Sequence, residues 1–115
     1  MNYLKLLIFL TAVLALACGQ TSNNLAVKDV AATRALYTEQ KCVTCHGEKG
    51  EGGIGPSFKA GVSMGRSVED IATRIGAGSG QMPSFKDKLN QEQIQDLAKY
   101  IYKEIQGREE PPISE

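Results

Sequence analysis

The sequence predicts a small all-α domain in which three to four helices are joined by long glycine-rich loops. Helical patterns with capping residues occur at residues 29–42, 67–75 and 90–106. Most of the twelve glycines lie between residues 47 and 80, which indicates loops in that part of the chain. No stretch alternates apolar and polar residues over the length of a strand. With 115 residues, the chain can bury one thin core.

The N-terminal segment has the composition of an export signal. One lysine precedes the apolar run "LLIFLTAVLALA". This run is shorter than the ~18 residues that a membrane-spanning helix needs, so we predict that residues 1–17 are a signal peptide. The "ALAC" that ends at Cys18 resembles the lipobox of bacterial lipoproteins, which implies a lipid on Cys18 and a membrane anchor. The alternative is that Cys18 merely lies near an ordinary cleavage site.

Charge and polarity divide the rest of the chain. Residues 18–28 are polar and predict a flexible tether, residues 29–107 contain the helical patterns, and residues 108–115 form an acidic, proline-bearing segment that predicts a disordered tail. The 13 basic and 13 acidic residues balance, so the sequence offers no basic face for nucleic acid.

The first helix of the domain is predicted to begin at Asp29, a good N-cap residue. Four apolar residues, Val30, Ala31, Ala35 and Leu36, fall on or near one side of this helix. We therefore expect that side to face the core.

The two later helices carry stronger signals at their N-termini. Ser67 followed by Asp70, and Asn90 followed by Gln93, both resemble capping boxes. After the second box, apolar residues recur with helical spacing and predict one packed face: Ile94, Leu97, Ala98, Ile101 and Ile105. Gly107 is expected to end this helix.

The segment "KCVTCHGEKG" carries the chemistry of the domain. Its pair Cys42 and Cys45 is followed directly by His46, the single histidine of the chain. A protein-only zinc site would need a fourth ligand, and a thioredoxin-like site would need a preceding strand. A simple disulfide would leave the glycine-rich loops with nothing to fold around. Attachment of a haem c through both thiols, with the adjacent histidine on the iron, uses all three residues and is the interpretation that we favour.

A sixth iron ligand has two candidates, Met64 and Met82. Met82 lies in "GSGQMPSF", where Gly80 frees the backbone and Pro83 stiffens the turn that would present the sulfur. We therefore predict Met82 as the ligand. Met64, in "VSMGRS", is expected to fill space in the core, as methionines commonly do.

Residues from about 31 to 106 resemble a class I monohaem c-type cytochrome. The resemblance rests on the C-x-x-C-H after the first helix, on "GIGPSF", on the M-P loop, and on "DLAKYIYKEI" in the last helix. It implies a fold wrapped around one covalent haem, with the Pro56 carbonyl accepting a hydrogen bond from His46. Tyr100 takes the place of the aromatic residue that packs on the first helix. Tyr37 lies five residues before Cys42, whereas in many relatives the spacing is four.

The predicted function is single-electron transfer at a bacterial membrane surface, outside the cytoplasm and without enzymatic activity. Two axial ligands leave no open iron position, and a thioether favours the ferrous state. A monomer is expected to meet redox proteins transiently through loops 54–58 and 81–85, with Lys59, Lys86 and Lys88 around them. The alternatives are a haem sensor, a small peroxidase with a labile sixth ligand, and a dedicated haem subunit of a larger oxidase or reductase.

Overall fold

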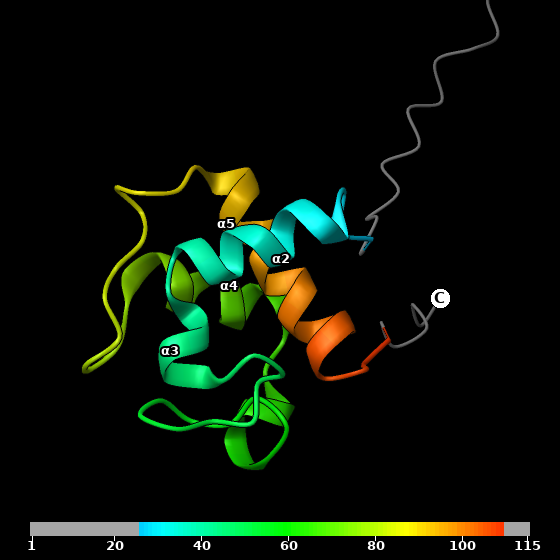
Figure 1. The fold of residues 1–115 in the computed structure, drawn as a ribbon, viewed down its shortest axis with the longest axis vertical. Coiled ribbons are helices and arrows are strands. Elements are labelled where there is room, and N and C mark those ends of the chain that lie inside the picture. The colour runs from blue at the N-terminus through cyan, green and yellow to red at the C-terminus, as the bar shows by residue number, and fades with distance from the viewer. Residues whose placement is uncertain (1–25, 110–115) are drawn as a thin grey trace, which may run out of the picture.

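Helices account for the regular structure of residues 26–109, the part of the chain that this computed structural model describes (Figure 1). In chain order the elements are α2 (Val30–Glu39), α3 (Cys42–His46), the 3₁₀ helix η1 (Gly61–Gly65), α4 (Val68–Ala77), α5 (Gln91–Tyr100) and the π-helix η2 (Ile101–Ile105). Within these residues the only strand-like pairing is an isolated bridge between Ser79 and Met82. The predicted all-α fold is confirmed. The predicted signal peptide, Cys18, most of the tether and most of the acidic tail lie outside the described residues.

Three helices start at the N-cap residues that the sequence predicts, and capping hydrogen bonds stabilise each start. The Asp29 side chain accepts from the Ala32 N–H at 3.0 Å at the start of α2. The Ser67 and Asp70 side chains each accept from the other's backbone N–H at 3.1 Å. The same reciprocal pair joins Asn90 and Gln93 at the start of α5. These bonds satisfy N–H groups that the first helical turn leaves without partners.

The buried side of α2 differs from the prediction. Val30, Ala31 and Ala35 are exposed, and only Leu36 of the four predicted residues is half-buried. Thr33 and Tyr37 are buried instead. Both can be buried because their hydroxyls have partners: Thr33 donates to the Asp29 carbonyl at 2.7 Å and Tyr37 to the Gly47 carbonyl at 2.9 Å. The buried side of α2 therefore carries two hydroxyls, one bonded within the helix and one bonded to the turn after α3, which the apolar pattern does not predict.

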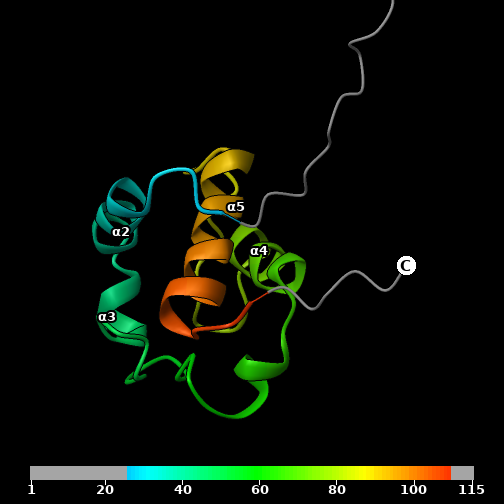
Figure 2. The same cartoon turned by 90° about the vertical axis from the view of Figure 1, so that its right-hand side faces the viewer.

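The core forms where α5 packs against both α2 and α4, and Figure 2 shows α5 lying between them. Its largest fully buried side chains are Tyr37 and Leu97. The rings of Tyr37 and Tyr100 lie 5.9 Å apart at an interplanar angle of 52°, so α2 and α5 meet through these two aromatics. The predicted packing of Tyr100 on the first helix is thus present.

The contacts of the domain extend slightly beyond the boundaries expected at 29 and 107. Val27 packs against the core, and Lys28 forms an exposed ion pair with Glu92 at 2.9 Å. At the other end, Arg108 donates to the Arg66 carbonyl at 2.7 Å, and Gly107 has a φ of +65° just after the last helical turn. Among residues 26–109, no helix has the length and apolar character that crossing a membrane requires.

Candidate functional site

The short helix α3 carries both cysteines and the histidine. A left-handed residue, Lys41 with a φ of +62°, separates α3 from α2 and allows the chain to turn there. Cys42 and Cys45 form no disulfide with each other, and both residues are half-buried. Burial raises the pKa of the Cys42 thiol to about 11. Surroundings that disfavour a thiolate suit an uncharged thioether, so the burial of Cys42 is compatible with covalent haem attachment.

The imidazole of His46 is buried and held by one hydrogen bond. Its Nδ1 atom lies 2.9 Å from the carbonyl oxygen of Pro56, the contact that the sequence predicts. Because a carbonyl oxygen can only accept, Nδ1 carries the proton and the lone pair lies on Nε2. Nε2 makes no hydrogen bond within residues 26–109. Every fully buried side-chain nitrogen or oxygen in those residues has a partner, so Nε2 is not fully buried. Nε2 is therefore accessible to an iron atom.

The glycine-rich loop after α3 wraps closely around this imidazole. The Phe58 ring stacks on the His46 ring with centroids 4.3 Å apart and an angle of 22°. A Cβ atom on Gly55 would lie 2.8 Å from Cε1 of His46, closer than non-bonded carbon atoms allow. The Gly55 N–H also donates to the Cys45 carbonyl at 2.8 Å. This role of Gly55 was not predicted from the sequence, although the "GIGPSF" motif contains the residue.

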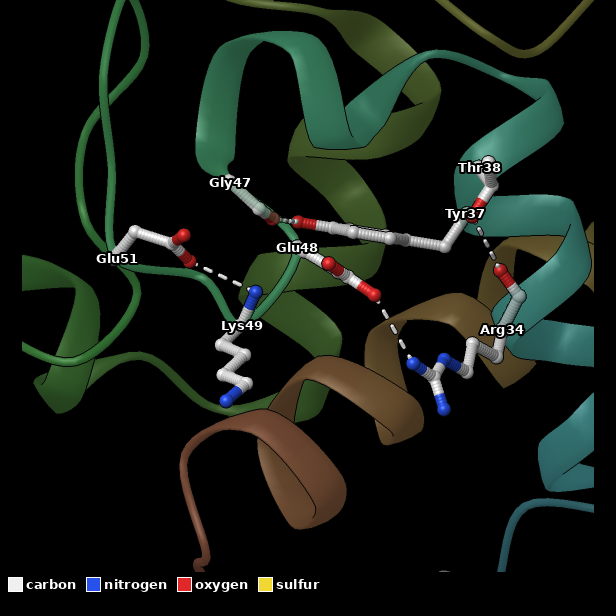
Figure 3. A network of polar contacts seen from close by, with 7 residues as sticks. All are labelled: Arg34, Tyr37, Thr38, Gly47, Glu48, Lys49 and Glu51. Carbon is white, nitrogen blue, oxygen red and sulfur yellow. Dashed lines mark hydrogen bonds and ion pairs between the residues drawn. The ribbon is translucent and has the colours of Figure 1, made fainter.

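A hydrogen bond and an ion pair join the turn that follows His46 to α2 (Figure 3). The buried Tyr37 hydroxyl donates to the Gly47 carbonyl at 2.9 Å, and Arg34 forms an exposed ion pair with Glu48 at 3.2 Å. Burial raises the pKa of the Tyr37 phenol above its usual value, so the hydroxyl stays protonated and able to donate. These contacts hold the C-terminal end of α3 in place.

Met82 lies at the end of a tight turn. The backbones of Ser79 and Met82 exchange two hydrogen bonds, of 3.1 and 3.0 Å, and Gly80 between them has a φ of +57°. Gly78 is packed more tightly: its φ is +75°, and an added Cβ would lie 2.7 Å from the Met82 carbonyl oxygen. The positive φ of Gly80 agrees with the freedom that the sequence predicts for this residue, whereas the close packing of Gly78 was not predicted.

The two methionines differ in their surroundings. The half-buried Met82 packs against the hydrophobic core, whereas Met64 lies in η1 and is not among the partly buried residues packed against that core. The expectation that Met64 fills space in the core is therefore wrong.

The loops predicted to meet redox partners are only partly exposed. Ile54 is 75% exposed, but Phe85 is buried, and the Lys88 ammonium lies 5.6 Å from the centre of the Phe85 ring. Two surface hollows lie along α2, and neither is lined by a cysteine, His46 or a methionine. In the described part of the chain, no three His, Cys, Asp or Glu side chains are grouped to hold a metal ion.

Known proteins of one kind match this chain. Residues 28–101 match the family described as cytochrome C oxidase, cbb3-type, subunit III. Cytochrome c-550 of Bacillus subtilis (strain 168) is 34% identical over 88 residues, which cover 76% of this chain and 71% of that protein. The cytochrome c-553-like protein of Synechocystis is 37% identical over 82 residues, 70% of this chain and 74% of that protein.

A further relative is much longer. The menaquinol:cytochrome c reductase cytochrome c subunit of Bacillus subtilis is 37% identical over 67 residues, 57% of this chain. The match covers only 25% of that subunit. This chain therefore resembles only about a quarter of that subunit.

Proposed function

Because the chain belongs to the class I c-type cytochromes and is an electron carrier with one haem c attached through Cys42 and Cys45, we propose that His46 and Met82 are the axial ligands of its iron. The haem supplies a one-electron redox couple. The observation that carries the proposal is the hydrogen bond from His46 Nδ1 to Pro56, which leaves Nε2 accessible.

The hydrogen bond to Pro56 fixes both the tautomer and the direction of the His46 ring. A second partner on the far nitrogen makes an imidazole a stronger donor to a metal. The stack with Phe58 limits rotation of the same ring. The chain thus holds His46 in one orientation in both oxidation states, which keeps reorganisation small during electron transfer.

Met82 would supply the second axial ligand from the turn that Gly78 and Gly80 make possible. A thioether is neutral and favours ferrous iron, which raises the reduction potential. With both axial positions filled by side chains, small ligands have no free position. This is why we propose a carrier rather than a peroxidase or a gas sensor.

We also propose that the domain works as a monomer at a membrane surface outside the cytoplasm, anchored by a lipid on Cys18. The seven residues from Gly19 to Leu25, which precede the first residues held on the domain, would let it move while bound. Extended residues span about 3.3–3.6 Å each, so this length reaches roughly 23–25 Å. That reach would allow one anchored domain to meet redox proteins embedded in the same membrane.

A dedicated role within a larger complex is the second candidate. One observation in its favour is the match to a family named for an oxidase subunit. Another is the similarity of this chain to a quarter of a reductase subunit. Such a subunit would co-purify with its complex after mild solubilisation, whereas a shuttle would be recovered alone.

The test compares two methionine variants, Met82→Ala and Met64→Ala. The oxidised parent should show the weak far-red absorption band of a sulfur–iron bond and should be low-spin in both oxidation states. Met82→Ala should lose the band, lower the reduction potential and bind carbon monoxide, because loss of the thioether opens one iron position. Met64→Ala should change none of the three. If the parent binds carbon monoxide readily, or if Met64→Ala loses the band, the assignment of Met82 is wrong.

A further inference from the structure

We propose that Gln106 is a positioning residue for His46, acting through the Phe58 ring to set the reduction potential. The inference rests on the proposed ligation of iron by His46. Gln106 lies just past the last helical turn and far in sequence from the C-x-x-C-H motif. No pattern in the sequence singles it out.

The carboxamide of Gln106 bridges two segments that no other side chain joins by hydrogen bonds in the described part of the chain. Its Nε2 donates to the Phe58 carbonyl at 3.0 Å and to the Ser63 carbonyl at 3.0 Å. An amide nitrogen carries two hydrogens, so both bonds can form at once. The bridge ties the loop around the imidazole to η1, and both to the end of the C-terminal helix.

Phe58 transmits this restraint to the imidazole. Its ring stacks on His46, while its N–H donates to the Gly50 carbonyl at 2.8 Å. The backbone of Phe58 is therefore held on one side by Gly50 and on the other by Gln106. Pro56, which accepts the hydrogen bond from His46, lies only two residues earlier in the same loop. Release of the Phe58 carbonyl would loosen both restraints on the imidazole.

The π-helix η2 explains how Gln106 reaches this position. The Gln106 N–H donates to the Ile101 carbonyl at 2.9 Å. This i to i+5 hydrogen bond fits one more residue into the turn than an α-helix has. Residues after such a turn are rotated about the helix axis relative to an uninterrupted α-helix. The methyl Cγ2 of Ile105 packs so closely over Gly50 that a Cβ there would collide with it. Ile105 and Gln106 together bring the helix end onto the loop.

Arg108 orients the carboxamide. Its Nη1 donates to Gln106 Oε1 at 3.4 Å and to the Arg66 carbonyl at 2.7 Å, and its guanidinium lies 4.2 Å from the centre of the Tyr102 ring. With Oε1 facing Arg108, Nε2 faces the two loop carbonyls. The amide assignment therefore agrees with all three of its hydrogen bonds.

Loss of the bridge should raise the reduction potential. The hydrogen bond to Pro56 makes His46 a stronger donor, and a stronger donor favours ferric iron. When the loop loosens, that bond weakens and ferrous iron is favoured. Entry of water would have the opposite effect, because a more polar surrounding stabilises the more highly charged ferric site.

The experiment compares Gln106→Met with Gln95→Met in the haem-loaded protein. Methionine keeps the length and neutrality of glutamine but cannot donate. Gln95 is the matched control because it is half-buried on α5 and makes no side-chain hydrogen bond within residues 26–109. At a fixed applied potential, Gln106→Met should raise the ferrous-to-ferric ratio about three- to tenfold, where tenfold equals about 59 mV for one electron. Gln95→Met should leave the ratio unchanged.

Two further readouts separate positioning from general destabilisation. The paramagnetically shifted haem methyl signals, which report the orientation of the axial imidazole, should move in Gln106→Met alone. Hydrogen exchange of the Phe58 amide should become faster. Gln106→Asn, which keeps the amide but is one methylene shorter, should shift the potential in the same direction and serves if Gln106→Met yields no folded protein.

Two results would overturn the proposal. An unchanged potential and unchanged methyl shifts, even with lower stability, would make Gln106 merely structural. A lowered potential would indicate water entry rather than a change at His46. The far-red band should persist in Gln106→Met. Its absence from the parent protein would overturn the assignment of Met82 and not this inference, which rests on His46.

Discussion

The side chain of His46 and the backbone of Pro56 are joined by a 2.9 Å hydrogen bond that passes directly beside Gly55. A Cβ atom at Gly55 would lie 2.8 Å from Cε1 and 3.0 Å from Nδ1 of the same ring. The loop can therefore place its carbonyl on the imidazole only because residue 55 has no side chain. Glycine is required here for close approach and not for an unusual φ.

This relationship predicts the effect of Gly55→Ala. The methyl group should push the His46 ring away from Pro56, destabilise the folded state by about 1–3 kcal/mol as overpacking does, and shift the reduction potential. Gly53→Ala is the matched control, since its nearest non-neighbouring atom, the Cys45 carbonyl oxygen, is 3.4 Å away. Voltammetry and thermal unfolding measure both effects. Equal potentials for the two variants would contradict the steric argument.

The buried Tyr37 predicts a loss of stability at alkaline pH. Burial raises the pKa of its phenol in the folded state, while the unfolded chain has the usual value near 10. The resulting stabilisation is fully present below pH 10 and decreases as the pH rises above 10 toward the folded-state pKa. Tyr37→Phe should therefore flatten the decline in unfolding free energy above pH 10.

The same variant should behave differently at neutral pH. There it loses the hydrogen bond to the Gly47 carbonyl, which should cost about 0.5–1.5 kcal/mol. Denaturant unfolding of the parent and of Tyr37→Phe from pH 7 to 11.5 measures both effects. Parallel stability curves over that whole range would show that the phenol does not titrate differently in the two states.

Local signals in the sequence were sufficient to place the starts of α2, α4 and α5, but not the break between α2 and α3 or the 3₁₀ helix η1. The caps at Asp29, Ser67 and Asn90 join residues only three apart, so the short pattern already contains both partners of each bond. The orientation of α2 was mispredicted because the apolar count ignores the carbonyl acceptors that allow Thr33 and Tyr37 to be buried, one within the helix and one in the turn after α3. A polar side chain whose hydrogen-bonding groups have partners can be buried in place of an alanine.

The same distinction applies to the site. The C-x-x-C-H motif and the Pro56 contact follow from short segments and a family resemblance. Gln106 could not be predicted, because its partners Phe58 and Ser63 are 48 and 43 residues away and depend on a π-helical turn. Gly78 was missed because its tight packing against the backbone of residues 82–84 exists only in the folded loop.

The proposed lipid on Cys18 can be tested by mass. A lipidated cysteine of this type carries two acyl chains on a thioether-linked glycerol, and two chains hold a protein on a membrane stably where one does not. The membrane fraction should contain a chain that begins at Cys18 with the added lipid mass. Cys18→Ser should lack that mass and leave the membrane, while Ser22→Ala should remain. If Cys18→Ser stays with the membrane as the parent does, the anchor is elsewhere.

The turn before Met82 provides a second matched glycine pair, Gly78 and Gly80. Both residues have positive φ, +75° and +57°, so alanine at either position should cost about 1–2 kcal/mol of backbone strain. Only Gly78 is also crowded: a Cβ there would lie 2.7 Å from the Met82 carbonyl oxygen and 2.8 Å from the Ser84 nitrogen. At Gly80 the added atom would meet nothing within 4 Å.

Gly78→Ala should therefore displace the loop that presents Met82, whereas Gly80→Ala should weaken the fold without moving that loop. In the oxidised protein, Gly78→Ala should reduce the far-red sulfur–iron band and allow carbon monoxide to bind the reduced form. Gly80→Ala should keep the band and exclude carbon monoxide, with a lower midpoint of thermal unfolding. If both variants keep the band equally, the crowding at Gly78 does not position Met82. If both lose it, backbone strain alone is sufficient to release the ligand.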